Sequence, residues 1–183
     1  MFEDSDSYYH QYASFDPQRD PNSFVFKSKV ENLGQLDFSP PEITVPTKEA
    51  YFGMGWFYHP EALFGATEGV IQTSVGYAGG TKKHPTYQDL GDHTEIVRII
   101  YDPTEIDYKQ LLSIFRNNHN PSMHYQRQYW SIILYTSEEQ LISAQECLQF
   151  LEKASSSTIH TKLVPFEKFI PAESYHQKYI LQK

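Results

Sequence analysis

The chain has 183 residues, a formal net charge of −8 and a hydrophobic content of 39%. This length favours one domain with its own core, and the acidic balance argues against nucleic-acid binding, which needs a basic face. No apolar run is long enough to cross a bilayer, and the acidic segment over residues 1–6 lacks the features of a secretory signal. The single cysteine, Cys147, excludes an intramolecular disulfide, so we expect a reducing compartment, the cytoplasm.

Residues 1–47 differ in composition from the rest of the chain. They are rich in Asp, Ser, Pro, Asn and Gln, and their prolines interrupt any regular element. We predict an extended or disordered N-terminal arm over residues 1–47 and one domain over residues 48–183. The aromatic side chains of the arm could instead hold it against the domain or bind a partner.

Strand and helix patterns mix from residue 48 onward. Strands are predicted over residues 50–57, 70–77, 94–101, 130–135 and 162–169. Helices are predicted from Pro60, after the capping residue Asp107, and from a capping box of Ser137 and Gln140 to about residue 154. A short helix or turn should follow Pro171. This mixture predicts an α/β (α+β) fold built on one sheet.

Short motifs follow one another in a set order along this domain. They include the runs Phe52-Gly53-Met54-Gly55, Gly76-Tyr77-Ala78-Gly79-Gly80, Pro85-Thr86-Tyr87, His93-Thr94-Glu95, Asn118-His119-Asn120-Pro121, Gln128-Tyr129-Trp130-Ser131 and Pro171-Ala172-Glu173-Ser174-Tyr175-His176-Gln177. Their order over roughly residues 50–180 resembles the class A peptide methionine-S-sulfoxide reductase family. The resemblance implies the fold of that family, a single domain around a ferredoxin-like mixed sheet.

The resemblance also implies a site. In the family, a cysteine follows the Gly-x-Gly turn at a helix N-terminus, where its thiolate attacks the sulfoxide sulfur. An acid and two tyrosines hold the sulfoxide oxygen, and an aromatic pair packs against the methyl group. The matching positions of this chain are Trp56 in place of the cysteine, Phe57 and Tyr58 as the aromatic pair, Tyr87 and Tyr129 as the tyrosines, and Glu95 as the acid. Because an indole has no nucleophile to replace a thiolate, we predict a family member that is inactive in sulfoxide reduction, with no metal and no cofactor.

The remaining candidate residues are histidines and the single cysteine. Two loops, after Tyr87 and after Pro121, look shorter than in the family; if they meet, His93, His119 and His124 could cluster, although they lack zinc-type spacing. We expect Cys147 to be a buried structural residue. His176 lies in a family motif and should support the site from the C-terminal segment.

Trp56 could fill the former active site or build a new aromatic wall. In the second case the six matched positions resemble an aromatic cage, which binds methylated ammonium groups with about 0.5–2 kcal/mol per contact. Glu95 could be a structural carboxylate or an acid whose pKa burial raises.

Three functions therefore stand open. The chain could be a non-catalytic homologue that binds a methylated or sulfoxide-bearing side chain or a partner protein, and we favour this one. It could be an enzyme of altered chemistry that uses Glu95, Tyr87 and Tyr129, or retain residual peptide-methionine (S)-S-oxide reductase activity. It could also be a scaffold whose N-terminal arm carries the interaction.

Overall fold

The computed structural model describes residues 46–182. The arm predicted over residues 1–47 therefore lies outside the described residues, apart from its last two positions.

The centre of the fold is a four-stranded antiparallel sheet with two helical crossovers. Its elements are β1 (Lys48–Met54), α1 (Tyr58–Gly65), β2 (Val70–Ala78), β3 (Thr94–Tyr101), α2 (Tyr108–Asn117) and β4 (Ser131–Tyr135). The strands lie in the order β4-β1-β3-β2, with every neighbouring pair antiparallel. This is the ferredoxin-like arrangement, so the predicted fold class is confirmed.

The last part of the chain extends this sheet at both edges. After α3 (Glu138–Ala154), β5 (Lys162–Pro165) pairs in parallel with β4, and β6 (Phe169–Pro171) pairs antiparallel with β2. The single strand predicted over residues 162–169 is therefore wrong. The backbone N–H of Phe166 still donates to the carbonyl oxygen of Tyr135 at the end of β4, and its ring stacks on Tyr51 of β1 at 4.2 Å. The parallel pairing with β4 ends there, and the chain joins β2 from Phe169.

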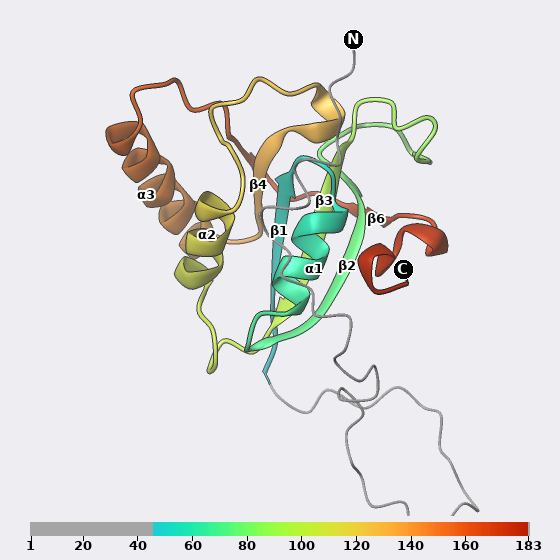
Figure 1. The fold of residues 1–183 in the computed structure, drawn as a ribbon, viewed down its shortest axis with the longest axis horizontal. Helices are drawn as coiled ribbons and strands as arrows, with labels where there is room; N and C mark the ends of the chain where they lie inside the picture. The colour runs from blue at the N-terminus through green and yellow to red at the C-terminus, as the bar shows by residue number, and fades with distance from the viewer. Residues whose placement is uncertain (1–45, 183) are drawn as a thin grey trace, which may run out of the picture. The chain divides into compact units, whose positions relative to one another are not determined.

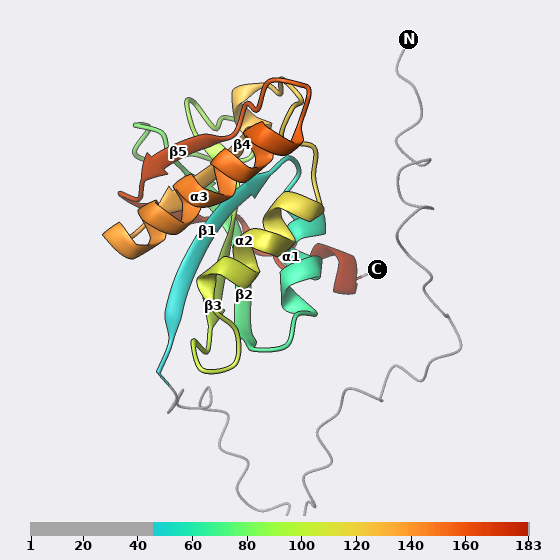
Figure 2. The same cartoon turned by 90° about the vertical axis from the view of Figure 1, so that its left-hand side faces the viewer.

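The two faces of the sheet bury different clusters, because successive strand residues point to opposite sides. One cluster joins Phe52, Val97 and Ile99 of the strands to Phe64 and Phe115 of the helices. Helices α1, α2 and α3 lie on this face (Figures 1 and 2). On the opposite face, strand residues pack against the segment that joins β5 to β6; this cluster includes Tyr51, Ile96, Ile132, Leu134, Phe166 and Phe169. None of the helices in the described part of the chain has the length and apolar character needed to cross a bilayer.

Helices α2 and α3 start after their predicted capping residues, whereas α1 starts at Tyr58, two residues before the predicted Pro60, and has no side-chain cap. Asp107 accepts a hydrogen bond from the backbone of Gln110, whose side chain bonds back to the backbone of Asp107, and this completes a capping box. Ser137 also accepts a hydrogen bond from the backbone of Gln140. The Oε1 of Gln140, however, accepts a hydrogen bond from the backbone N–H of Thr136 at 2.9 Å and not from that of Ser137, so the second half of the predicted box does not form. The Nε2 of Gln140 donates to the carbonyl oxygen of Glu49 in β1 at 2.7 Å.

Candidate functional site

The turn between β1 and α1 brings the first site residues to the surface. Gly55 has a φ of +85°, in the left-handed region that favours glycine. The strand therefore ends at Met54, whereas the sequence predicted an end near residue 57. Trp56 follows with 50% of its surface exposed, whereas the next side chain, Phe57, is buried. Phe57 also precedes the first turn of α1, so the two rings leave the same turn in different environments.

Glu95 of β3 is the buried carboxyl of the site. It is only 1% exposed. Its Oε2 accepts a hydrogen bond from the backbone N–H of Phe57 at 3.1 Å, and its Oε1 accepts one from Nε2 of Gln128 at 2.8 Å. Burial raises the pKa of Glu95 to about 7, against the effect of these two hydrogen bonds. The carboxyl therefore exists in both protonated and ionised forms at neutral pH.

Two tyrosines contact the rings of the β1–α1 turn. The ring centroid of Trp56 lies 6.1 Å from that of Tyr129, and Phe57 stacks on Tyr87 at 6.4 Å. The pKa of Tyr129 is raised, first by burial and then by the charge of Glu95. Burial first, and then the charge of Glu95, raise the pKa of Tyr87 to about 12, so its hydroxyl keeps its proton at neutral pH.

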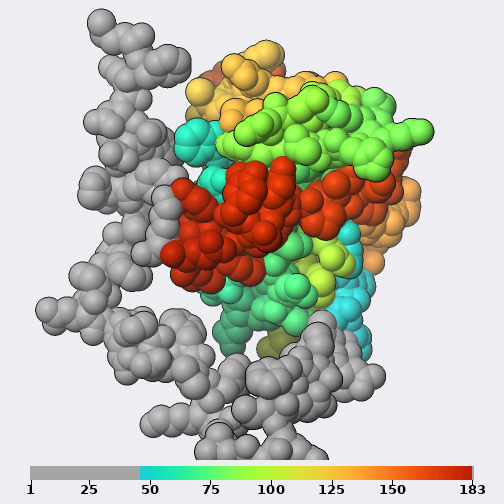
Figure 3. Space-filling model, turned by 90° about the vertical axis from the view of Figure 1, so that its right-hand side faces the viewer, coloured from blue at the N-terminus to red at the C-terminus, as the bar shows by residue number. Residues whose placement is uncertain are grey.

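The C-terminal segment packs against this group of aromatic residues. His176 is buried, its ring lies 4.4 Å from that of Tyr87, and its Nδ1 is hydrogen-bonded to the hydroxyl of Tyr58 at 2.5 Å. Tyr58 also stacks on Tyr179 at 4.2 Å. Burial lowers the pKa of His176, which favours the neutral ring. The space-filling view shows the C-terminal segment, in red, lying against the green surface of the central part of the chain (Figure 3).

The structure thus brings together all six predicted site residues. We call five of them the aromatic cluster: Trp56, Phe57, Tyr58, Tyr87 and Tyr129. Phe57 contacts Tyr58 at 5.0 Å and Tyr87 at 6.4 Å, and it also carries the N–H that binds Glu95. The cluster is thus built from the β1–α1 turn, the first residue of α1, the loop after β2 and the loop before β4, and Phe57 links it to the buried carboxyl.

The histidine cluster that the sequence left open does not form. His93 binds the carbonyl oxygen of Lys82 at 2.8 Å, His119 binds Ser131 at 2.7 Å, and the ring of His124 contacts that of another histidine. Across residues 46–182, no group of three or more His, Cys, Asp or Glu side chains is arranged to hold a metal ion.

Comparison with known proteins identifies the relatives of this site. A family model described as peptide methionine sulfoxide reductase matches residues 48–183. The chain belongs to the peptide methionine sulfoxide reductase family.

Relatives within this family come from several kingdoms. A peptide methionine sulfoxide reductase of Drosophila melanogaster is 47% identical over 152 residues, which cover 81% of this chain and 62% of the relative. The chain therefore spans less than two thirds of the length of that protein. A reductase of Methanococcus maripaludis is 41% identical over 147 residues, covering 75% of this chain and 94% of its own.

A solved structure supports the same family fold. Methionine sulfoxide reductase A of Corynebacterium diphtheriae superposes with a TM-score of 0.70 and is 31% identical, covering 75% of each chain.

Two residues of this family site escaped the sequence analysis. Gln128 donates to Glu95, and Glu173 accepts hydrogen bonds from the hydroxyl of Tyr77 at 2.7 Å and the backbone N–H of Tyr87 at 3.1 Å. Both belong to motifs quoted for the family resemblance, which was the available signal. Cys147, by contrast, is where the sequence places it: buried in α3, with its Sγ 3.9 Å from the carbonyl oxygen of Leu112 in α2.

Proposed function

We propose that this chain is a non-catalytic member of the reductase family that binds an oxidised or methylated side chain of a protein partner. Trp56 stands where the family resemblance places the nucleophilic cysteine, and an indole cannot attack sulfur. The only thiol, Cys147, contacts α2 instead of the aromatic cluster, and burial raises its pKa, which disfavours the reactive thiolate.

The observation that carries the proposal is the half-exposed ring of Trp56 beside the buried carboxyl of Glu95. Because Trp56 keeps 50% of its surface exposed, it presents a face to a ligand and is not sealed inside the domain. A sulfoxide oxygen could accept a hydrogen bond from the protonated carboxyl or from a tyrosine hydroxyl. A methylated ammonium group would instead meet the ring faces and the ionised carboxyl.

The partner in this proposal is a protein or peptide that presents such a side chain, and the compartment is the cytoplasm. The acidic chain fits neither a nucleic acid nor an anionic membrane as that partner.

The test combines a turnover assay with a binding assay. A peptide that contains methionine-S-sulfoxide is incubated with the chain and excess dithiothreitol, and reduction is followed by mass spectrometry. Calorimetry measures binding of the same peptide and of a trimethyllysine peptide. We expect no reduction and saturable binding of at least one peptide, weakened by Trp56→Ala and unchanged by Phe150→Ala, a matched exposed aromatic residue.

Two results would overturn the proposal. One is reduction that Cys147→Ser abolishes, because the remaining thiol would then be a relocated nucleophile. The other is the absence of binding to both peptides. Gain of reduction in Trp56→Cys would support the proposal, since it would show that the rest of the site still accepts the sulfoxide.

A second candidate function rests on the pKa of Glu95. A carboxyl with a pKa of about 7 next to two tyrosines is suited to proton transfer at neutral pH. Glu95 could protonate the sulfoxide oxygen while an external thiol attacks the sulfur; two thiols would then give a thioether, a disulfide and water. This candidate requires reduction that Glu95→Gln abolishes and Cys147→Ser leaves intact.

A further inference from the structure

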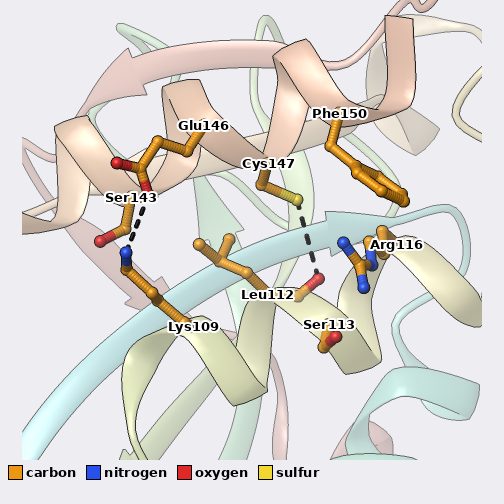
Figure 4. Close-up of a pocket in the computed structure, with 8 residues that line it drawn as sticks. All are labelled: Lys109, Leu112, Ser113, Arg116, Ser143, Glu146, Cys147 and Phe150. Atoms are coloured by element: carbon orange, nitrogen blue, oxygen red, sulfur yellow. Dashed lines mark hydrogen bonds and ion pairs between the residues drawn. The ribbon is translucent and has the colours of Figure 1, made fainter. Parts of the chain in front are cut away.

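A second candidate site lies between helices α2 and α3, apart from the aromatic cluster. It is a cavity of about 160 Å³ with none of the cluster residues in its lining. Figure 4 shows side chains from the two helices facing each other across it. Its apolar wall is Leu112, Cys147 and Phe150, and its charged groups are Lys109, Arg116 and Glu146.

The charges of the cavity do not balance. Lys109 Nζ lies 2.8 Å from Glu146 Oε2, so these two groups neutralise each other. Arg116 stacks its guanidinium over the ring of Phe150, with 4.4 Å between Cζ and the ring centroid. In the part of the chain that the structure describes, no carboxylate pairs with Arg116, and its buried Nε has no hydrogen-bond acceptor. One positive charge therefore stays uncompensated in a chain whose net charge is −8.

The form of this cation restricts the ligand. The planar guanidinium group of arginine presents parallel N–H donors that match the two oxygens of a carboxylate. The apolar wall beside it suits a hydrocarbon body, and a cavity of roughly 150 Å³ with apolar walls is large enough for one benzene ring. A carboxylate attached to a ring of that size would satisfy both parts of the cavity.

Cys147 contributes packing to this site and no chemistry. Its Sγ points toward the carbonyl oxygen of Leu112, at 3.9 Å (Figure 4). Burial raises the pKa of the thiol, and the positive charge of Arg116 offsets part of that rise. The thiol is therefore neutral and forms part of the wall.

We propose that the cavity between α2 and α3 binds a small organic anion, a carboxylate with an apolar body about the size of one aromatic ring. Arg116 binds the carboxylate, while Leu112, Cys147 and Phe150 contact the body. The site does not depend on the function proposed above, because it shares no residue with the aromatic cluster.

Benzoate is the probe, with benzamide and benzylamine as neutral and cationic probes of the same size. Saturation-transfer NMR measures binding to the full chain. Because the chain contains one cysteine, its rate of modification by methyl methanethiosulfonate reports occupancy next to Cys147. We expect benzoate to slow this reaction saturably and to bind more tightly than benzamide, with benzylamine the weakest.

Variants of Arg116 decide the outcome. Arg116→Gln should weaken benzoate binding by about tenfold or more, the loss typical of a hydrogen bond to a charged group. Arg116→Lys, which keeps the charge but not the paired donors, should give an intermediate affinity and carries the test if Arg116→Gln does not fold. Lys153→Gln removes a positive charge from α3, the other helix beside the cavity, at a position outside the lining, and should leave benzoate binding unchanged. Equal binding of benzoate and benzamide, unchanged affinity in both Arg116 variants, or no protection of Cys147 would overturn the proposal.

Discussion

The backbone N–H of Phe57 donates a hydrogen bond to Oε2 of Glu95 over 3.1 Å. This hydrogen bond links the turn after β1 to a carboxyl near the start of β3. Because Trp56 precedes Phe57 directly, the position of its exposed ring depends on whether the carboxyl is held in place. Loss or protonation of Glu95 should therefore change both the stability of the domain and the geometry of the aromatic cluster.

The first prediction concerns the pH dependence of stability. The pKa of Glu95 is raised from 4.5 to about 7, so the folded protein binds more protons than the unfolded chain between these values. Glu95 therefore contributes its full share to the free energy of unfolding below pH 4.5, and this contribution is lost as the pH rises through about 7. As the pH rises from about 5 to about 8, the free energy of unfolding of the native chain should fall by roughly 2–3 kcal/mol more than that of Glu95→Gln.

Urea unfolding at both pH values measures this difference. Glu105→Gln is the control, because Glu105 is exposed and should leave the slope of stability against pH unchanged. Parallel slopes for the native chain and Glu95→Gln would contradict the burial of this carboxyl.

The second prediction tests the close approach of β1 to β4. A Cβ at Gly53 would lie 2.5 Å from Ile132 Cγ2 and 2.8 Å from the carbonyl oxygen of Trp130. Gly53→Ala should therefore overpack the sheet and lower the free energy of unfolding by about 1–3 kcal/mol. Gly65→Ala is the matched control, since the nearest atom to its Cβ is Thr73 Oγ1 at 3.4 Å. Denaturant titration of both variants gives the comparison, and equal stabilities would count against the packing at Gly53.

The third prediction concerns the charge pair of Glu61 and Lys178. Lys178 Nζ lies 3.1 Å from Glu61 Oε1, a contact of charge without hydrogen-bond alignment, and the backbone N–H of Lys178 donates to Oε2. The carboxylate side chain is 3% exposed, but that of Lys178 is 41% exposed, so solvent screens part of the interaction. Lys178→Met should lower the free energy of unfolding by about 1–3 kcal/mol, since it leaves the buried carboxylate of Glu61 without a positive partner.

A double-mutant cycle with Glu61→Gln isolates this pair. The double variant should be more stable than the two single losses predict when added together. Strict additivity would show that the two groups do not interact.

The fourth prediction concerns the C-terminal segment. The hydroxyl of Tyr77 donates to Glu173 Oε2 at 2.7 Å, and the other oxygen of Glu173 holds the backbone N–H of Tyr87. Because Tyr77→Phe removes the first of these hydrogen bonds, it should lower the free energy of unfolding by about 1–2 kcal/mol. Amide hydrogen exchange should accelerate in residues 173–177 while α3 keeps its protection, because only the local segment loosens. Unchanged exchange in that segment would show that the hydrogen bond does not hold it.

The sequence predicted an element best where both its hydrophobic pattern and its hydrogen-bond partners lie within a few residues of each other. β3 spans the predicted residues 94–101, because its β-branched run is buried on both faces. Asp107 caps α2 through a residue three positions away. Gln140 departs from the predicted box because its Oε1 accepts hydrogen bonds from Thr136 in place of the backbone N–H of Ser137. The strand predicted over 162–169 splits because its two halves join opposite edges of the sheet, and the hydrophobic pattern does not identify which edge a strand joins.

The site residues came from the family resemblance and not from periodicity. Glu95 is drawn to Phe57 across 38 positions and to Gln128 across 33, and such partners leave no local signature. The raised pKa of Glu95 was one of two readings of the sequence; burial, which the fold creates, favours it. The resemblance therefore located the residues, and the fold supplied their environment.

The last described strands determine when the domain can be completed during synthesis. β5 closes the β4 edge and β6 closes the β2 edge, and both lie after residue 161. A nascent chain that has not yet emerged past α3 would expose two strand edges, each able to pair with a neighbouring polypeptide. We therefore expect the sheet of the newly made domain to close only after residue 171 has emerged from the ribosome, and a chain cut short before β5 to aggregate.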